Sequence, residues 1–367
     1  MHIALLNMQQ QSKGGLEKFS IRFRKHLEMR GCTVSALHGN SLLLPKTRLR
    51  KKRAFDQACL RFTEKYPDAV FCLEKIAFPY HSVKNSPIYL RLGEGLHTSY
   101  LQQRFTYSPF WKRQLLHYSR FHQGLLSIEK TAFMHPQLKR IFCNSSMVRK
   151  ELLATYQESC TIDPSSVSVI PNGVEWQEWE KPFSLWPEEK PKLLKKYGLK
   201  EGFHFLFVGS GWERKGLKPL LQAMTLLPKD AYLSVVGKDK RMRSFIRYAK
   251  TLGLEKQVHF FGSQPALFFY QYADCLVIPS YYDPFANVTL EGLAMGLQVL
   301  SSKHNGGSEI LPDSAVFNSI YDIDAVADGL KKALLFPKSW KSSQSQRALA
   351  KPYDYPIMLE KMAGYLV

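Results

Sequence analysis

Short runs of apolar residues, many of them β-branched or aromatic, recur along the chain, and each is followed by a Gly or polar turn and then a helical pattern. This alternation predicts parallel sheets covered by helices. In the first half we expect strands at 2–7, 33–37, 69–74, 88–92, 140–144 and 167–171. In the second half we expect them at 203–209, 231–237, 258–262, 274–280 and 298–302. The two sets predict an α/β fold with two doubly wound domains.

Glycine, proline and helix-capping residues indicate where the helices begin and end and where the domain boundary lies. A helix is expected between Gly15 and Gly31, and another, N-capped by Ser145, continues to about Tyr156. The stretch 171–192 holds four Pro and three Trp among many charges, which is typical of a linker. The amphipathic tail beginning near residue 353 predicts a last helix.

A chain of 367 residues exceeds one ordinary core, so we expect two domains. The N-terminal domain is predicted to span 1–172 and the C-terminal domain 173–350. Residues 351–367 are expected to form a helix that packs back on the N-terminal domain.

The composition restricts the class of protein. Hydrophobic residues make up 45% of the chain and aromatic residues 13%, as in folded globular proteins, and no apolar run approaches the roughly 18 residues of a spanning helix. The first residues show neither the basic start nor the apolar run of a signal peptide. The six cysteines form no C-x-x-C pair, so we expect neither a disulfide framework nor a metal site, and we expect a cytoplasmic location.

The formal net charge is +20, and it is unevenly distributed. Residues 1–170 carry 26 Lys and Arg against 11 Asp and Glu, whereas 171–367 carry 25 against 20. We therefore expect a partner with phosphates or anionic headgroups to meet the N-terminal half first.

A glycine-containing loop in the second half carries two adjacent cations. In 205–224 a strand ends at Gly209, and Arg214 and Lys215 stand just before a helix expected to begin near Leu217. Cations beside a helix N-terminus favour a phosphate-bearing ligand. The alternative is a solvated basic loop. The loop lacks the G-x-x-x-x-G-K-[ST] pattern of a Walker A site.

The segment DPFANVTLEGLAMG, residues 283–296, places two carboxylates at the start of a predicted helix. Asn287 is expected to cap a helix over about 288–295. The Asp283 and Glu291 carboxylates suit the hydroxyls of a sugar or a ribose, and the backbone N–H groups near Phe285 to Asn287 suit a phosphate. Alternatively, Glu291 pairs with a surface cation and Asp283 only begins a turn.

Residues 283–296 resemble the E-x7-E segment of retaining glycosyltransferases of family 4. Three further stretches resemble that family in the same order: VIPNGVE (169–175), VGSGWERKG (208–216) and NGGSEIL (305–311). A glycine pair, Gly14 and Gly15, stands where the family has its glycine-rich first loop. The resemblance covers both domains, strongly over 167–311.

The resemblance implies a GT-B fold, with two Rossmann-like domains that face a central cleft. It also implies a nucleotide-diphosphate sugar as the donor substrate, and a UDP-sugar is the donor we expect first. Neither a cofactor nor a metal ion is expected. Transfer with retention of configuration is expected.

The resemblance also assigns roles to residues. Asp283, Lys215 and Glu94 are the expected catalytic residues, with His97 competing with Glu94 for the acceptor side. The expected donor-binding residues are Gly14, Gly15, Arg214, Lys215, Asp283, Phe285, Ala286, Asn287 and Glu291. Arg214 and Lys215 would hold the diphosphate, and Glu291 would bind the ribose. Asp283 and the backbone of 285–287 would hold the sugar. Gly14 and Gly15 would let their loop approach the phosphates.

Three positions depart from the family pattern. Asp stands at 283 where Glu is usual, Ala286 and Asn287 replace the usual Gly-Leu, and Gln298 stands where Pro is common. We expect these differences to affect the identity of the donor sugar more than the type of reaction.

The acceptor is expected to be lipid-linked. Six cations lie within 46–53, and 100–123 interleaves basic and aromatic residues, as segments that touch anionic lipid do. With SIEKTAF (127–133), the chain looks most like family 4 enzymes that build the lipopolysaccharide core, so we expect a peripheral hexosyltransferase at the inner face of the cytoplasmic membrane. The alternative to membrane contact is a solvated basic face. The alternatives to the transferase function are a nucleotide-sugar epimerase and a nucleic-acid-binding protein, and the latter would leave the acidic segment unexplained.

Overall fold

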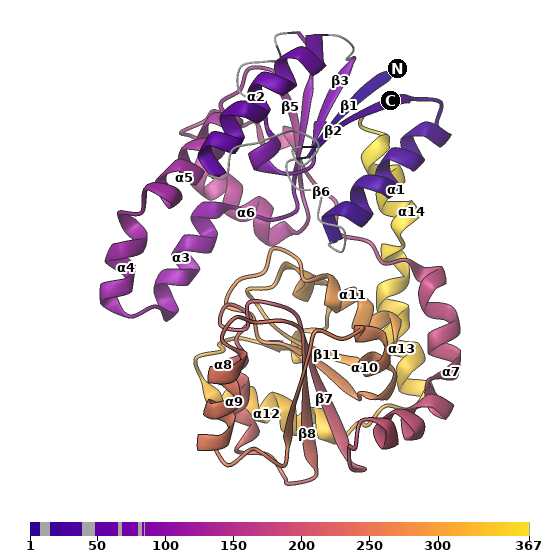
Figure 1. Ribbon diagram of the computed structural model, residues 1–367. Coiled ribbons are helices and arrows are strands. Elements are labelled where there is room, and N and C mark those ends of the chain that lie inside the picture. Colours follow the sequence, from indigo (N-terminus) through magenta and orange to yellow (C-terminus); the bar gives the residue numbers. More distant parts are fainter. Residues whose placement is uncertain (8–14, 39–47, 65–67, 80–82, 84, 367) are drawn as a thin grey trace. The chain divides into compact units, whose positions relative to one another are not determined.

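A computed structural model describes residues 1–7, 15–38, 48–64, 68–79, 83 and 85–366 (Figure 1). The chain divides into two compact units. The N-terminal unit contains Met1–Pro171 and Pro356–Val367, and the C-terminal unit contains Asn172–Tyr355. The sequence placed this boundary at 172/173 and expected the tail to join the N-terminal domain.

The N-terminal unit is built on a parallel six-stranded sheet of order β2-β1-β3-β4-β5-β6. Each strand lies where the apolar runs predicted one, within two residues at each end. The strands are β1 (His2–Asn7), β2 (Thr33–His38), β3 (Ala69–Cys72), β4 (Ile88–Leu92), β5 (Leu138–Cys143) and β6 (Val167–Val169). The order reverses between β1 and β3, as in doubly wound sheets.

Most described helices of this unit alternate with its strands along the chain. They are α1 (Gly15–Met29), α2 (Arg48–Glu64), α3 (His97–Tyr107), α4 (Phe110–His117), α5 (Arg120–Phe133) and α6 (Ser146–Tyr156), with short 3-10 turns at Lys75–Ala77 and Pro164–Ser166. The predicted cap of α6 is confirmed, because the Val148 N–H donates to Ser145 Oγ at 3.2 Å.

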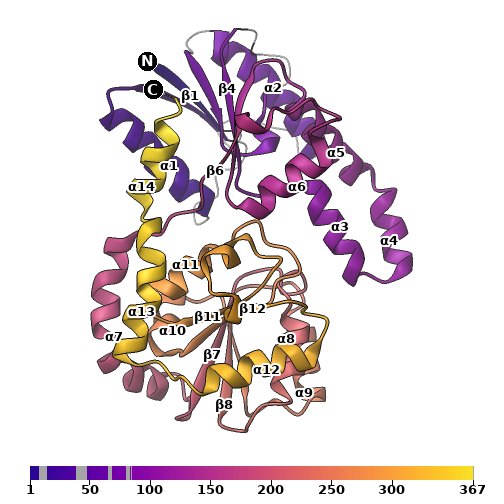
Figure 2. The same ribbon diagram turned by 180° about the vertical axis from the view of Figure 1, so that it is seen from behind.

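The end of the chain belongs to the N-terminal unit. The last helix, α14 (Tyr355–Ala363), runs beside α1 in both views (Figures 1 and 2). Glu360 pairs with His26 at 3.0 Å and with Arg30 at 3.2 Å, and the ring of Tyr365 packs on Phe142 in the sheet.

The C-terminal unit has its own parallel sheet, of order β12-β11-β10-β7-β8-β9. Its strands are β7 (Phe203–Val208), β8 (Ala231–Val236), β9 (Val258–Gly262), β10 (Cys275–Ile278), β11 (Gln298–Ser302) and β12 (Val316–Phe317). The first five were predicted. The sequence missed β12, because two residues give no detectable alternation. The strand order reverses between β7 and β10.

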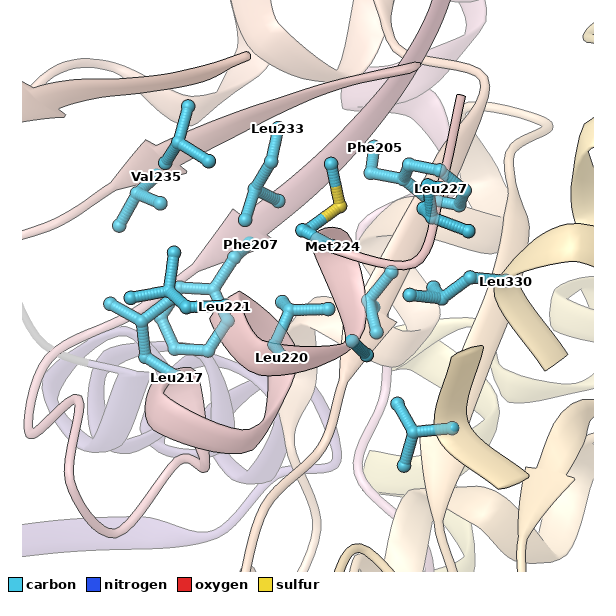
Figure 3. Close-up of a cluster of buried hydrophobic side chains, with 14 of the residues drawn as sticks. Phe205, Phe207, Leu217, Leu220, Leu221, Met224, Leu227, Leu233, Val235 and Leu330 are labelled. Carbon is cyan, nitrogen blue, oxygen red and sulfur yellow. The ribbon is translucent and has the colours of Figure 1, made fainter. Parts of the chain in front are cut away.

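Helices lie along this second sheet. They are α7 (Trp176–Lys196), α8 (Leu217–Met224), α9 (Met242–Thr251), α10 (Ala266–Tyr272), α11 (Asn287–Ala294), α12 (Ile323–Leu334) and α13 (Trp340–Ala350). Figure 3 shows the buried cluster in which α8 packs against β7 and β8: Phe205, Phe207, Leu217, Leu220, Leu221, Met224, Leu227, Leu233, Val235 and Leu330. This packing fixes the start of α8, and therefore the loop before it.

The predicted linker at 171–192 is wrong over most of its length, since α7 occupies Trp176–Lys196. Three prolines lie inside the helix, each of which removes a backbone donor. The cost is offset by burial of one apolar face, which includes Phe183 and Trp186, against the C-terminal unit. Tertiary packing therefore overrides the local signal of the prolines.

The loop between β7 and α8 offers a matched pair of glycines for a test of packing. Gly211 and Gly216 have nearly equal φ angles, 72° and 73°, so alanine at either position bears the left-handed penalty of about 1–2 kcal/mol. A Cβ on Gly211 meets no described atom within 4 Å, whereas one on Gly216 would lie 1.8 Å from the Pro279 carbonyl oxygen.

We expect Gly216→Ala to lower the free energy of unfolding by about 1–3 kcal/mol more than Gly211→Ala does, because the loop must move away from the end of β10. Chemical denaturation of the two variants measures this difference. Equal destabilisation would show that the close approach of the loop to Pro279 contributes nothing.

Candidate functional site

The carboxyl ends of β7 and β10 are adjacent in the sheet although they lie some 70 residues apart in the chain. Because the strand order reverses between these two strands, the loops that follow them lie where doubly wound sheets bind ligands. The loop after β7 carries Arg214 and Lys215, and the loop after β10 carries Asp283. The topology thus brings both motifs to one edge of one sheet.

Three charged side chains from these loops are in direct contact. Lys215 Nζ lies 2.9 Å from Asp283 Oδ2, and Arg214 Nη1 lies 3.3 Å from the same oxygen. Arg214 Nη1 also donates to the Tyr282 carbonyl at 2.5 Å, and the Tyr281 N–H donates to the Arg214 carbonyl at 2.9 Å. Arg214, Lys215 and Asp283, called here the charge cluster, therefore join the two loops.

Both cations contact one oxygen of Asp283, and no donor among the described residues reaches Oδ1. Burial alone would raise the pKa of this carboxyl, but the charges and hydrogen bonds of Lys215 and Arg214 hold its pKa below the ordinary value. Asp283 is therefore ionised at neutral pH. Its Oδ1 can accept a hydrogen bond from a ligand hydroxyl.

Buried polar contacts shape the loop that carries the cations. Trp212 is fully buried, and its indole Nε1 donates to the Gly209 carbonyl at 2.8 Å. The Trp212 backbone N–H donates to Asp239 Oδ2, also at 2.8 Å. The loop is thus tied both to the end of β7 and to the loop after β8.

Asn305, after β11, connects the second loop to the third. It is fully buried; its Oδ1 accepts from the Ala286 N–H at 2.9 Å and the Gly307 N–H at 3.1 Å, and its Nδ2 donates to Ser301 and Thr289. All four hydrogen-bonding positions of its amide are filled. Asn305 begins the motif NGGSEIL (305–311), but no role was predicted for it.

The backbone of Asp283 is also held by the loop after β11. The Asp283 N–H donates to the His304 carbonyl, and the Gly306 N–H donates to the Asp283 carbonyl, both at 2.9 Å. Such paired bonds fix the direction in which the side chain leaves the backbone. The Asp283 carboxylate is thus positioned before any ligand arrives.

The structure corrects the expected start and cap of the helix after β10. Helix α11 begins at Asn287, so Ala286 holds the cap position, and Asn287 Oδ1 instead accepts from Asn172 Nδ2 at 2.7 Å. The Ala286 N–H, expected to hold the donor, is bonded to Asn305. Phe285 is buried in the core, and its carbonyl accepts from Asn172 at 3.4 Å.

Glu291 lies one turn inside α11, as predicted. Its Oε2 accepts from the Tyr270 hydroxyl of α10 at 2.8 Å. Burial raises the pKa of Tyr270, and the charge of Glu291 raises it further, so Tyr270 remains a donor. Tyr270, to which the sequence assigned no role, thus orients the carboxylate.

The other expected site residues belong to the N-terminal unit. Gly14 lies outside the described residues, and Gly15 is the first residue of α1. Glu94 is exposed in the loop directly after β4, and His97 is the first residue of α3. Among the described residues, no group of three or more His, Cys, Asp or Glu side chains is arranged to hold a metal ion.

The charge cluster generates a pH-dependent prediction. Because the pKa of Asp283 is lower in the folded protein than in the unfolded chain, its ion pairs stabilise the fold above the ordinary Asp range. That stabilisation is lost as pH falls through the lower folded pKa. We therefore expect Asp283→Asn to lower the melting temperature near pH 7. Below about pH 4 the difference in melting temperature between the variant and the unaltered protein should shrink as the pH falls. A difference from the unaltered protein that is constant with pH would show that the ion pairs add no stability.

Comparisons with known proteins identify the domain that contains these residues. The profile of the group 1 glycosyl transferases matches residues 189–348, which include Arg214, Lys215, Asp283, Glu291 and Asn305. The lipopolysaccharide glucosyltransferase WaaG of Escherichia coli strain K12 is 28% identical over 230 residues, 60% of this chain. The chain spans 61% of the length of that curated relative.

Solved structures share the fold over the whole chain. The crystal structure of WaaG, a glycosyltransferase involved in lipopolysaccharide biosynthesis, has a TM-score of 0.75 at 20% identity and covers 100% of this chain and 99% of that one. Anabaena Alr3699/HepE in complex with UDP has a TM-score of 0.71 at 16% identity, with coverages of 100% and 99%. Residues 189–348 therefore form a group 1 glycosyltransferase domain, and the chain has the GT-B fold that its resemblance to glycosyltransferase family 4 predicts.

Proposed function

We propose that the protein is a retaining glycosyltransferase that moves a hexose from a nucleotide-diphosphate sugar to a membrane-associated acceptor of the lipopolysaccharide-core type. The observation that carries this proposal is the charge cluster at the switch point of a group 1 glycosyltransferase domain. UDP-sugar is the proposed donor, and the structural relative in complex with UDP supports that choice.

The charge balance of the cluster suits a diphosphate. Two cations face one ionised carboxylate, which leaves one unit of positive charge in the cluster before a ligand binds. The Arg214 side chain is 32% exposed, so solvent and ligand reach it, whereas Lys215 is largely covered at 13%. We assign the diphosphate to Arg214 and Lys215, and the ribose hydroxyls to Glu291.

In the proposed reaction the bond between the sugar C1 and the diphosphate oxygen breaks while C1 bonds to the acceptor oxygen on the same face. The acceptor proton passes to the departing diphosphate. Negative charge grows on the leaving group, and preorganised cations stabilise such charge without any metal in this proposal. Asp283 holds Lys215 in place through Oδ2, and its Oδ1 accepts from a sugar hydroxyl.

On the acceptor side we propose Glu94, with His97 nearby, as the polar group that meets the acceptor. Glu94 is exposed after β4, at the carboxyl edge of the N-terminal sheet, where ligands of doubly wound sheets bind. The name of the Escherichia coli relative, a lipopolysaccharide glucosyltransferase, supports an acceptor of this kind.

We propose that α4 brings the enzyme to the inner face of the cytoplasmic membrane. With α3 it projects beyond the sheet of the N-terminal unit (Figure 1). It exposes Phe110, Trp111, Leu115 and, at its end, Tyr118, each at least 65% accessible, beside the exposed Arg113 and Arg120. Aromatic and basic side chains together suit an anionic lipid surface. Of the basic run 46–53, residues 46 and 47 and the side chains of the rest lie outside what the structure describes. No helix in the described residues is both long and apolar enough to cross a bilayer.

The role of Lys215 is tested with Lys215→Ala, and Lys218→Ala is the matched control. Lys218 is also a lysine at the start of α8, but it is exposed and lies over the ring of Tyr248. We expect Lys215→Ala to reduce turnover of UDP-sugar by about 100-fold or more, as when one preorganised donor is deleted, and Lys218→Ala to change it little.

Steady-state assays with a panel of UDP-sugars and lipopolysaccharide acceptors measure this effect. Unchanged turnover in folded Lys215→Ala would refute the assigned role. Product analysis separates the epimerase alternative, because an epimerase converts the donor sugar in the absence of any acceptor.

Membrane contact by α4 is tested with the triple substitution Trp111→Ser, Leu115→Ser and Tyr118→Ser. Each side chain that enters the lipid interface contributes on the order of 1 kcal/mol or more, so we expect binding to anionic vesicles to weaken by at least about tenfold. The control is Leu335→Ser with Phe336→Ser, which removes two exposed apolar side chains from the C-terminal unit. Vesicle sedimentation at low salt measures both variants. Equal weakening in both, or no binding by the unaltered protein, would contradict this function of α4.

A further inference from the structure

Glu129, on α5, is a completely buried carboxylate in the N-terminal unit that the proposed chemistry does not use. Its Oε2 accepts from Lys75 Nζ at 2.7 Å and from the His97 N–H at 2.6 Å. Its Oε1 accepts from the Tyr156 hydroxyl at 2.8 Å and from Thr98 Oγ1 at 2.9 Å, with the Thr98 N–H at 3.3 Å. One side chain therefore gathers donors from three other segments of the chain.

The Glu129 carboxylate replaces the missing cap of α3. The residue at the cap position is Leu96, which has no side-chain hydrogen bond to offer. The first N–H groups of a helix have no partner within the helix, and they carry the positive end of its dipole. Glu129 accepts the N–H groups of His97 and Thr98, so a negative charge from α5 fixes where and in which direction α3 begins.

The same contacts fix the loop between β4 and α3. Lys75, which is paired with Glu129, also donates to the Gly95 carbonyl, and Asn144 Nδ2 donates to the Gly93 carbonyl at 3.0 Å. Glu94 lies between Gly93 and Gly95, whose carbonyls are held, and Glu94 itself is exposed. His97, at the other end of the loop, contacts His122 of α5, with 3.0 Å between its Nε2 and Nδ1 of His122.

The placement of this charge needs a reason beyond stability. Burying a carboxylate and an ammonium group costs several kcal/mol, and replacing such a pair by apolar side chains is often neutral or stabilising. Burial would raise the pKa of Glu129, but Lys75 and the other donors lower it below its usual value, so the group is ionised. An ionised, fully coordinated carboxylate specifies one arrangement of the loop, which an apolar contact would not.

We propose that Glu129 is a positioning residue that sets the β4–α3 loop so that Glu94 and His97 meet the acceptor. This inference rests on the proposed function. Glu129 touches no substrate; it acts through the loop. Engagement of the acceptor therefore depends on it, whereas binding of the nucleotide by the C-terminal unit does not.

The test is Glu129→Gln, which keeps the volume of the side chain but places an NH₂ group against two donors. The probes are UDP-glucose, UDP, and lipopolysaccharide truncated within its core. We expect kcat/KM for the acceptor to fall by about 10- to 100-fold, the range caused by a misplacement of about 1 Å. We expect the thermal shift given by UDP and the slow hydrolysis of UDP-glucose by water to stay within about twofold of the unaltered protein.

Val148→Ala is the matched control for stability. Val148 is fully buried on the neighbouring α6 and contacts no member of the Glu129 network by hydrogen bond. We expect its truncation to lower the melting temperature while the hydrogen bonds that hold the β4–α3 loop remain. If the role of Glu129 were merely structural, the two variants would lose acceptor kcat/KM in parallel with their melting temperatures, and that result would overturn the proposal.

Tyr156→Phe provides a milder second variant, which removes one of the donors to Glu129 and keeps the ring packed. We expect the same selective loss for the acceptor, of about 3- to 10-fold, smaller than for Glu129→Gln because only one donor to the carboxylate is removed. If Glu129→Gln does not fold, this variant decides, and an unchanged acceptor kcat/KM overturns the inference. If the unaltered protein neither binds UDP nor transfers sugar to any acceptor, the proposed function itself fails, which is a distinct result.

Discussion

The contact between Lys215, Arg214 and Asp283 is the interaction on which the C-terminal site depends. It requires the loop after β7 and the loop after β10 to meet, and they meet because the sheet places these two strands side by side. A largely buried ion pair is useful only when its geometry is fixed, since the desolvation cost of the charges is otherwise not recovered. Trp212, Asn305 and the close approach of Gly216 to Pro279 supply that geometry.

The two units use the same physical device for different ends. In each, a buried carboxylate pairs with a lysine and ties loops at the carboxyl edge of a parallel sheet: Glu129 with Lys75, and Asp283 with Lys215. Glu129 is saturated, with donors on both oxygens, so it has no capacity for a ligand. Asp283 has both of its cations on one oxygen and keeps the other available. The saturated carboxylate suits positioning, and the unsaturated one suits recognition.

The strands were predictable because a buried parallel strand must be apolar along its length, and the motif loops were predictable because they follow those strands. The features that were missed depend on partners distant in sequence. Helix α7 exists despite three prolines because the C-terminal unit buries its apolar face. Asn305 accepts a hydrogen bond from the Ala286 N–H, 19 residues away in the sequence. Glu129 caps α3 from about 31 residues away. No local pattern marks such contacts, since an isolated Asn or Glu in a sequence is usually a surface residue.

The aspartate at position 283 departs from the glycosyltransferase family 4 pattern that this segment resembles, yet it contacts both cations. A shorter side chain should reach less far by about one carbon–carbon bond, about 1.5 Å. Even so, Asp283 contacts Lys215 at 2.9 Å, because hydrogen bonds to the segment after β11 hold its backbone against the cation loop. The contact of Asp283 Oδ2 with both cations is therefore preserved. In the proposed function Oδ1 accepts from the sugar, so we expect the substitution to affect which hexose is accepted more than how the leaving group is stabilised.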